Sequence, residues 1–323
     1  MTSIVCLGEA LIDFFPAEIG KPLAEVSAFL PMPGGAPANV AVAAARLGGS
    51  SAFVGAVGDD AWGHHLASVL AREGVNIQGL RFLKEARTGI NFHAMPDAQR
   101  AEHLFYRHPS ADQRLTPEDL DERLLRHARA LHIGSISLLN EPARSATLRA
   151  IKLARAGRAL ISYDVNYRPD LLSDPRAARR LILRLLPDVD IVKVNEDEAY
   201  LLTASRRSEE VLDVLLEAGP GLAVLTLGAR GCVFACEGSR GRVPGYVTEV
   251  VDAVGCGDAF MAALLCSLVA GEGDWREHLR GDLCSIFRYA NAAGALTGTQ
   301  RGALPALPTA ESVATFLRAA AQG

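Results

Sequence analysis

The sequence has no apolar run long enough to span a membrane. A transmembrane helix needs about 20 apolar residues in succession, and the best candidate, residues 259–271, is shorter. The chain begins with the apolar stretch 4–7, and no basic segment or small-residue cleavage site comes before it. These absences disfavour a membrane or exported protein, and we expect a cytoplasmic one.

Paired cysteines, clustered histidines and an excess of positive charge are also missing. The six cysteines lie singly in apolar segments, without a CxxC pair or a histidine at ligand spacing. They are typical of small core residues in a reducing compartment. A formal net charge of -4 and scattered arginines give no support for a nucleic-acid partner.

The chain does contain short apolar runs that alternate with amphipathic helical segments. Strands are predicted at 4–7, 51–57, 130–133, 159–165, 190–194, 222–227, 231–235 and 245–251, and helices at 40–47, 60–73, 117–128, 141–156, 174–186, 195–203, 208–217, 275–296 and 309–321. This alternation predicts an α/β fold with a mainly parallel sheet covered on both faces. No internal repeat or low-complexity linker divides the chain.

Two stretches depart from the alternation. Residues 14–33 are rich in proline and lack a helical period, and residues 87–107 hold two half-exposed strand patterns. Pro96 and Asp97 separate the two patterns, as turn residues do in a hairpin. We expect the hairpin to be an insertion that stands off the main sheet.

Polar or glycine residues follow nearly every predicted strand. Asp13, Asp164, Asn195 and Thr226 stand at such positions. Because ligands bind beyond the carboxyl ends of parallel strands, we expect these side chains to share one edge of the sheet and one site.

The most informative stretch is 252–260, which leads into the apolar segment 261–270. Gly255 and Gly257 bracket Cys256, and Asp258 follows at once. Glycines permit a sharp turn, and the free N–H groups at the start of a helix bind anions. Because a carboxylate repels an anion, Asp258 indicates proton chemistry beside a bound phosphate. The alternative is a helix-capping acid, which stabilises a helix by about 0.5–2 kcal/mol.

A second glycine turn precedes the predicted helix 40–47. Gly34 and Gly35 form this turn, and Asn39 follows four residues after Gly35. Backbone at such a turn can approach a ligand closely. The alternative is a tight loop before a well-packed helix.

Four stretches together carry a resemblance to a known family. Residues 34–41, 195–198, 226–231 and 252–260 resemble, in this order, the motifs of ribokinase-like (PfkB) carbohydrate kinases. The resemblance covers nearly the whole chain. Within the family, residues 8–13, 105–112 and 164–169 are most similar to those of fructokinases, bacterial ones in particular.

The resemblance implies one ribokinase-like domain over residues 1–323. Its fold would be a Rossmann-like three-layer α/β/α core with a small β lid formed by about 14–33 and 87–107. The implied activity is the ATP-dependent phosphorylation of D-fructose at O6.

In that family the residue at Asp258 is the base that removes the proton of the sugar hydroxyl. Gly255, Cys256 and Gly257 would offer backbone N–H groups to the transferred phosphoryl group. Mg²⁺ would accompany ATP near Asn195 and Glu198, mostly through water, and the resemblance also allows K⁺ near Asp252. The physics agrees, because phosphoryl transfer needs preorganised donors and an aligned nucleophile.

The resemblance also implies residues for the two substrates. Sugar recognition would fall to Asp13, Gly34, Gly35, Asn39, Arg107 and Arg168. Nucleotide contacts would come from Asn195, Glu198, Thr226, Gly228, Gly231 and Asn291. For the two arginines, the alternative is a surface salt bridge.

Other functions stay open at this stage. A 2-keto-3-deoxygluconate kinase, or another sugar or nucleoside kinase of the family, is one, because Arg107 and Arg168 suit a carboxylate. Asp13 argues against it, since an acid would repel that carboxylate. A nicotinamide-dependent dehydrogenase would need G-x-G-x-x-G after the first strand, which is missing. A non-catalytic sugar-binding regulator would have no need of Asp258.

Two further expectations concern assembly and redox chemistry. The exposed face of the lid, with Ile90, Phe92 and Phe105, would pair with its copy in a two-fold homodimer. Cys256 stands where alanine is usual in the family, and its thiol would make the protein sensitive to oxidants.

Overall fold

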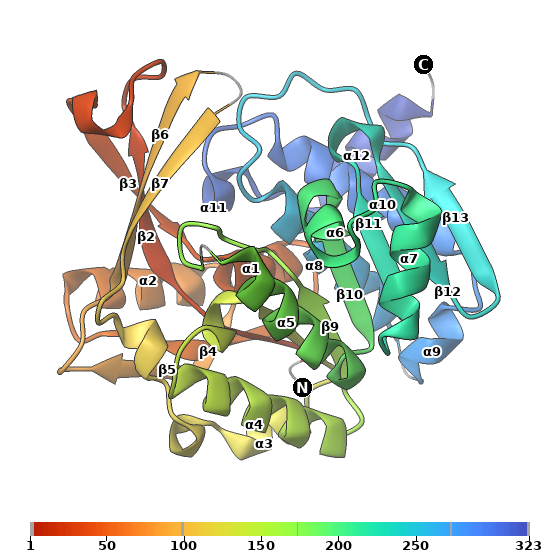
Figure 1. The fold of residues 1–323 in the computed structure, drawn as a ribbon, viewed down its shortest axis with the longest axis horizontal. Coiled ribbons are helices and arrows are strands. Elements are labelled where there is room, and N and C mark those ends of the chain that lie inside the picture. The colour runs from red at the N-terminus through yellow and green to blue at the C-terminus, as the bar shows by residue number, and fades with distance from the viewer. Residues whose placement is uncertain (1–2, 98–99, 173, 272, 322–323) are drawn as a thin grey trace.

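The computed structural model describes residues 3–97, 100–172, 174–271 and 273–321. A nine-stranded sheet forms its centre, with strand order β13-β12-β11-β10-β9-β8-β1-β4-β5 (Figure 1). The strands are β1 (Ile4–Leu7), β4 (Ser51–Gly58), β5 (Asn76–Leu83), β8 (Ala130–Gly134), β9 (Leu160–Asp164), β10 (Ile191–Asn195), β11 (Leu222–Thr226), β12 (Cys232–Cys236) and β13 (Ser239–Val243). Neighbouring strands are parallel from β5 to β11, whereas β12 and β13 pair antiparallel at one edge. The predicted α/β fold with a mainly parallel sheet is confirmed.

Helices cover both faces of this sheet. One layer holds α1 (Ala36–Arg46), α2 (Ala61–Arg72), α8 (Cys256–Leu268), α9 (Trp275–His278), α10 (Leu283–Thr297), α11 (Ala303–Ala306) and α12 (Ala310–Ala320). The other holds α3 (Glu122–Arg126), α4 (Ala143–Ala156), α5 (Pro175–Leu185), α6 (Glu196–Thr203) and α7 (Ser208–Glu217). Side chains along β1 alternate between the two faces of the sheet. Ile4 and Cys6 belong to the core under the first helix layer, and Val5 and Leu7 to the core under the second.

The order of the strands fixes where a ligand can bind. The chain adds β4 and β5 on one side of β1, then returns to add β8 and its successors on the other. The sheet therefore has a topological switch point between β1 and β8. Crevices form at the carboxyl ends of strands at such a point.

A second sheet stands off the core at the upper left of Figure 1. Its strand order is β3-β2-β6-β7, with β2 (Leu11–Pro16), β3 (Phe29–Gly34), β6 (Gly89–Asp97) and β7 (Arg100–Tyr106). The hairpin of β6 and β7 is antiparallel, as the sequence predicts. In the register, Phe105 pairs with Asn91 and faces the core, so its predicted place on the outer face is wrong. Leu104 and Tyr106 lie on the outer face instead.

Three predictions of regular structure need correction, and two strands of the central sheet, β5 and β13, were not predicted. Residues 245–251 form no strand, because the chain leaves the sheet after Val243 and the Val247 side chain is fully exposed. The predicted helix 117–128 is a 3-10 turn followed by α3, since Asp121 caps a new helix by accepting from the Leu124 N–H group. The helix predicted at 275–296 is likewise divided into α9 and α10, where Asp282 caps the second.

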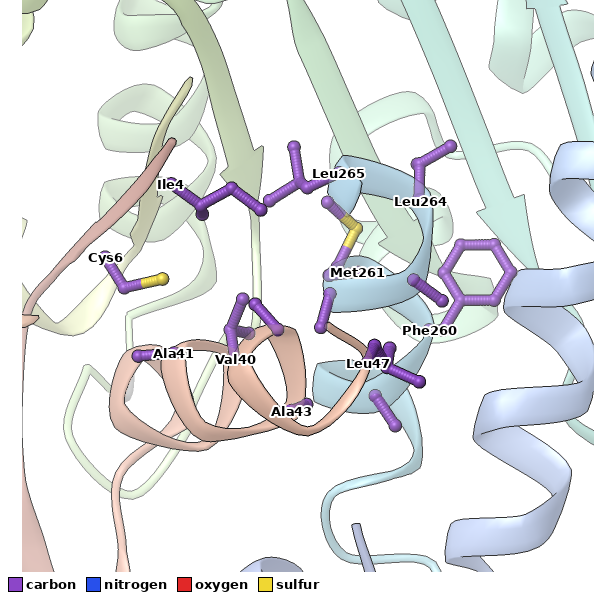
Figure 2. Close-up of a cluster of buried hydrophobic side chains, with 14 of the residues drawn as sticks. Ile4, Cys6, Val40, Ala41, Ala43, Leu47, Phe260, Met261, Leu264 and Leu265 are labelled. Atoms are coloured by element: carbon purple, nitrogen blue, oxygen red, sulfur yellow. The ribbon is translucent and has the colours of Figure 1, made fainter. Parts of the chain in front are cut away.

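Close packing of α1 against α8 sets the geometry near the switch point. Figure 2 shows Val40 and Ala43 of α1 on the side toward α8, and Ala41 on the side toward Cys6 of β1. The alanines are fully buried. Small side chains let two helices approach each other, so the first turns of α1 and α8 lie close together.

Within the described residues, no helix combines the length and apolar character needed to cross a membrane.

Candidate active site

A cavity of about 750 Å³ lies at the carboxyl ends of the strands, between the second sheet and the core. Its walls include most of the residues that the sequence singled out. These are Asp13, Gly35, Asn39, Arg168, Asn195, Thr226, Gly228, Gly231, Asp252, Gly255, Cys256, Gly257, Asp258 and Asn291. Gly34, Arg107 and Glu198 are not among the lining residues.

Asp258 lies in the first turn of α8 and is only 8% exposed. Its Oδ2 atom accepts a hydrogen bond of 2.8 Å from Nδ2 of Asn39, in the first turn of α1. Burial raises the pKa of Asp258 to about 6, against the opposing effects of the Asn39 hydrogen bond and of Lys193. The carboxyl group can therefore exchange a proton near neutral pH, as a general base must.

The turn before Asp258 presents backbone to the cavity. Gly255 has φ of 85°, a left-handed conformation that suits glycine. The N–H group of Cys256 donates to the Ala253 carbonyl group at 3.3 Å, whereas those of Gly255 and Gly257 have no partner among the described residues. The start of α8 is therefore ready to bind an anion.

A buried ion pair beneath this turn was not predicted. Nζ of Lys193, on β10, lies 2.9 and 2.8 Å from the two carboxylate oxygens of Asp164, at the end of β9. Burial alone would lower the pKa of Lys193, but the carboxylates of Asp164 and Glu198 outweigh it and raise that pKa. A Cβ atom on Gly257 would lie 3.1 Å from Nζ, so the positive charge sits beside the anion-binding turn. A lone lysine within the apolar run of β10 was the only signal in the sequence.

The opposite end of the cavity is lined by Asp13 of β2. Its Oδ1 atom lies 2.9 Å from Nδ2 of Asn91 and 2.6 Å from Nε2 of His93, both on β6. Gly34 contributes space, because a Cβ atom there would collide with Oδ2 of Asp13. Asn91 and His93 also line the cavity and were not predicted.

Arg107 lies outside the cavity. It is 1% exposed and forms an ion pair with Asp112, five residues further along the chain. Glu9 lines the cavity, and one of its oxygens accepts from the Ala36 N–H group at 3.1 Å. Burial raises the pKa of Glu9 to about 7, although Arg107 acts against that shift.

Asn195 and Glu198, expected near a metal ion mostly through water, form hydrogen bonds with the backbone. The oxygens of Glu198 accept from the N–H groups of Asn195 and Tyr167, each at 2.8 Å, and Oδ1 of Asn195 caps α6. No group of three or more His, Cys, Asp or Glu side chains within the described ranges is arranged to bind a metal ion. The oxygen atoms of Asn195 and Glu198 therefore fit a metal ion that is held mainly by the phosphates of a bound ligand and by water.

The remaining predicted residues form the far end of the cavity. Thr226 ends β11, and Gly228 and Gly231 shape the turn that follows. Nδ2 of Asn291 donates to the carbonyl groups of Val243 and Pro244 at 3.2 and 3.1 Å, so it positions that loop.

Asp252 and Cys256 have structural surroundings of their own. The Asp252 carboxylate accepts from the N–H groups of Val254 and Gly302 at 3.0 and 2.9 Å. Burial raises the pKa of the Cys256 thiol to about 12, which keeps the reactive thiolate scarce and argues against the expected oxidant sensitivity.

Comparisons with known proteins agree with one another. A family model described as pfkB family carbohydrate kinase matches residues 1–310. The chain is 43% identical over 316 residues to probable fructokinase-2 of Arabidopsis thaliana, covering 98% of this chain and 95% of that relative. It is 44% identical over 308 residues to fructokinase-2 of Zea mays, with 95% and 91% covered.

Solved structures are similar over the same length. The fructokinase from Vibrio cholerae O395, in a form with bound fructose, ADP and calcium ion, has a TM-score of 0.88 and 35% identity, with 98% and 99% of the two chains covered. The fructokinase with bound ATP from Xylella fastidiosa has a TM-score of 0.89 and 31% identity, with 99% of each chain covered.

The buried ion pair yields a prediction about stability. Lys193→Met leaves the Asp164 carboxylate buried and unpaired, so the free energy of unfolding should fall by about 3–5 kcal/mol. Replacing both partners, as Lys193→Met with Asp164→Leu, should recover most of this loss. Urea unfolding without ligand measures both. A single variant as stable as the wild type would contradict this account of the pair.

Proposed function

The chain belongs to the pfkB family of carbohydrate kinases, and from that premise we propose that it transfers the γ-phosphoryl group of ATP to the 6-hydroxyl group of D-fructose. One observation carries the proposal. A single cavity joins the polar end at Asp13 to the anion-binding turn at 255–257, with the buried carboxyl group of Asp258 between them. The fructose, ADP and ATP in the two similar solved structures support it.

Asp258 acts as the base in this proposal. It takes the proton of the 6-hydroxyl group while that oxygen forms its bond to the γ-phosphorus. The bond from the γ-phosphorus to the bridging oxygen breaks, and ADP leaves. The N–H groups of Gly255 and Gly257 and the ammonium group of Lys193 stabilise the charge on the transferred group. Asn39 holds the base by its hydrogen bond.

The other predicted residues divide between the two substrates. Asp13, Gly35, Asn39 and Arg168 contact the sugar, while Gly34 leaves room for the Asp13 carboxylate. Thr226, Gly228 and Gly231 contact the nucleotide, and Asn291 shapes its loop. We assign the second sheet, about 14–33 and 87–107, as the lid over the sugar.

Two kinds of cation complete the proposal. Mg²⁺ would supply positive charge to neutralise the triphosphate, and Asn195 and Glu198 would hold it through water, since their oxygens already accept backbone hydrogen bonds. The Asp252 carboxylate is similarly engaged. K⁺ near Asp252 would therefore be held mainly by backbone carbonyl oxygens.

The buried state of Arg107 favours fructose over 2-keto-3-deoxygluconate. A sugar acid needs a guanidinium group free to bind its carboxylate, but Arg107 is paired with Asp112 outside the cavity. Only Arg168 of the two candidate arginines lines the cavity, which also holds Glu9 and Asp13. A neutral polyol suits these acceptors better than an anion does.

We also propose a homodimer formed through the outer face of the second sheet. Phe14 and Phe92 stack there at 4.8 Å, and Tyr106, 61% exposed, lies against Phe92 at 5.7 Å. An exposed apolar face of this kind suits a two-fold contact.

A cytoplasmic location is supported by the six cysteines, all of which are free thiols.

The choice of sugar is tested by a coupled assay of ADP release over ketoses, aldoses and sugar acids. We expect kcat/KM to be highest for D-fructose, because Glu9 and Asp13 line the cavity while Arg107 lies outside it. A strong preference for 2-keto-3-deoxygluconate would overturn the assignment.

The pKa of Asp258 sets the acid limb of the pH profile. The base must be ionised, so kcat should fall as the pH drops through about 6, about two units above the limb of an ordinary aspartate. Asn39→Ala removes a hydrogen bond that lowers this pKa, and the acid limb should move to higher pH.

Asp258→Asn should lower kcat by roughly 10²-fold or more, with an unchanged circular dichroism spectrum. Near wild-type turnover in Asp258→Asn would rule out its role as base.

Sedimentation analysis tests the dimer. The wild type should sediment as a dimer at micromolar concentration, and Tyr106→Glu should sediment as a monomer, because it places a charge on the apolar face. Arg206→Glu, a charge change at an exposed site on the core, is the control and should leave the dimer intact. A wild type that is monomeric throughout would contradict the proposal.

A further inference from the structure

A polar cluster on the second sheet surrounds the Asp13 carboxylate. Asn91 and His93 lie two residues apart on β6, so both side chains point to the same face. Their nitrogens reach the same oxygen, Oδ1 of Asp13, at 2.9 and 2.6 Å. Nε2 of His93 also lies 2.7 Å from Nδ2 of Asn91, so the three side chains form one cluster. Because a carboxylate only accepts hydrogen bonds, the tautomer with a proton on Nε2 is the one that can donate to Asp13.

The His93 ring is held firmly in place. The Phe15 ring stacks on it with centroids 4.5 Å apart and planes 5° apart, and the His103 ring meets it edge-on at 4.8 Å. Burial lowers the pKa of His103 to about 4, so this neighbour is neutral at physiological pH. It adds no charge that would compete for Asp13.

The cluster leaves hydrogen-bonding capacity unused. Within the described part of the chain, the buried atoms Oδ1 of Asn91 and Nδ1 of His103 have no hydrogen-bond partner. Unpaired buried polar atoms lower stability, and apolar side chains at these positions would avoid that loss. Stability therefore does not explain the cluster, whereas its convergence on Asp13 does.

We propose that His93, with Asn91, is a positioning residue that occupies Oδ1 of Asp13 and aims Oδ2 at a hydroxyl group of the sugar. The inference rests on the proposed function, in which Asp13 binds the sugar. Gly34 leaves room for Oδ2, since a Cβ atom there would collide with it, and Asp13, Asn91 and His93 all line the cavity. Two donors on one oxygen fix the plane of the carboxylate before the sugar arrives, which reduces the ordering required on binding.

Steady-state kinetics of His93→Leu test the inference. KM for fructose should rise roughly tenfold or more, the effect of losing a hydrogen bond to a charged group. KM for ATP should stay unchanged, and kcat should change less than KM for fructose. His93→Gln keeps an N–H donor and should recover part of the affinity. The thermal unfolding midpoint of His93→Leu should equal or exceed that of the wild type.

A double-variant cycle separates positioning from a general effect on the lid. In an Asp13→Asn background, His93→Leu should add little, because the two residues act as a unit. His65→Leu, an exposed histidine on α2, is the matched control and should leave every parameter unchanged. If His93→Leu does not fold, Asn91→Leu removes the other donor and serves the same comparison.

The outcomes also separate this inference from the proposed function. A wild type without turnover on fructose contradicts the proposed function, and the comparison is then made with the sugar that the wild type uses best. An active wild type with an unchanged sugar KM in His93→Leu overturns the positioning role alone. Equal KM increases in the presence and absence of Asp13 would overturn it as well.

Discussion

One hydrogen bond, from Asn39 to Asp258, connects the two helix starts on which the site depends. It forms because α1 and α8 pack closely through small side chains, as Figure 2 shows. A larger residue in place of Ala43 would push the helices apart and separate the amide from the carboxyl group. The core packing therefore determines the protonation chemistry, because this hydrogen bond limits how far burial can raise the pKa of Asp258.

The second constraint is electrostatic. Asp258, Asp164 and Glu198 are buried near one another, and Lys193 is the cation among them. Its ammonium group lies beside Gly257, where a phosphoryl group would add further negative charge. Lys193 thus compensates a buried carboxylate in the free protein and also faces the place where charge develops during transfer.

Hydrophobic periodicity predicted the α/β core well, because alternating strands and amphipathic helices bury the surfaces that their patterns expose. It failed at residues 245–251, whose β-branched residues are typical of a strand, although the chain leaves the sheet after Val243 and Val247 is fully exposed. Motifs of glycine and acid led to Asp258 and the turn before it. Contacts between distant strands were beyond such reasoning. The sequence did not indicate that the lone lysine on β10 pairs with Asp164, or that His93 contacts Asp13. It also did not indicate that Arg107 is buried in an ion pair with Asp112.

A crystal structure of the chain with fructose, Mg²⁺ and a non-hydrolysable ATP analogue tests the central claim most directly. The account predicts that O6 of fructose lies within hydrogen-bond distance of an Asp258 carboxylate oxygen, about 2.6–3.2 Å. The γ-phosphoryl group should meet the N–H groups of the turn at 255–257 on the far side of that oxygen. A different fructose hydroxyl group at Asp258, or a γ-phosphoryl group bound away from the turn, would contradict it.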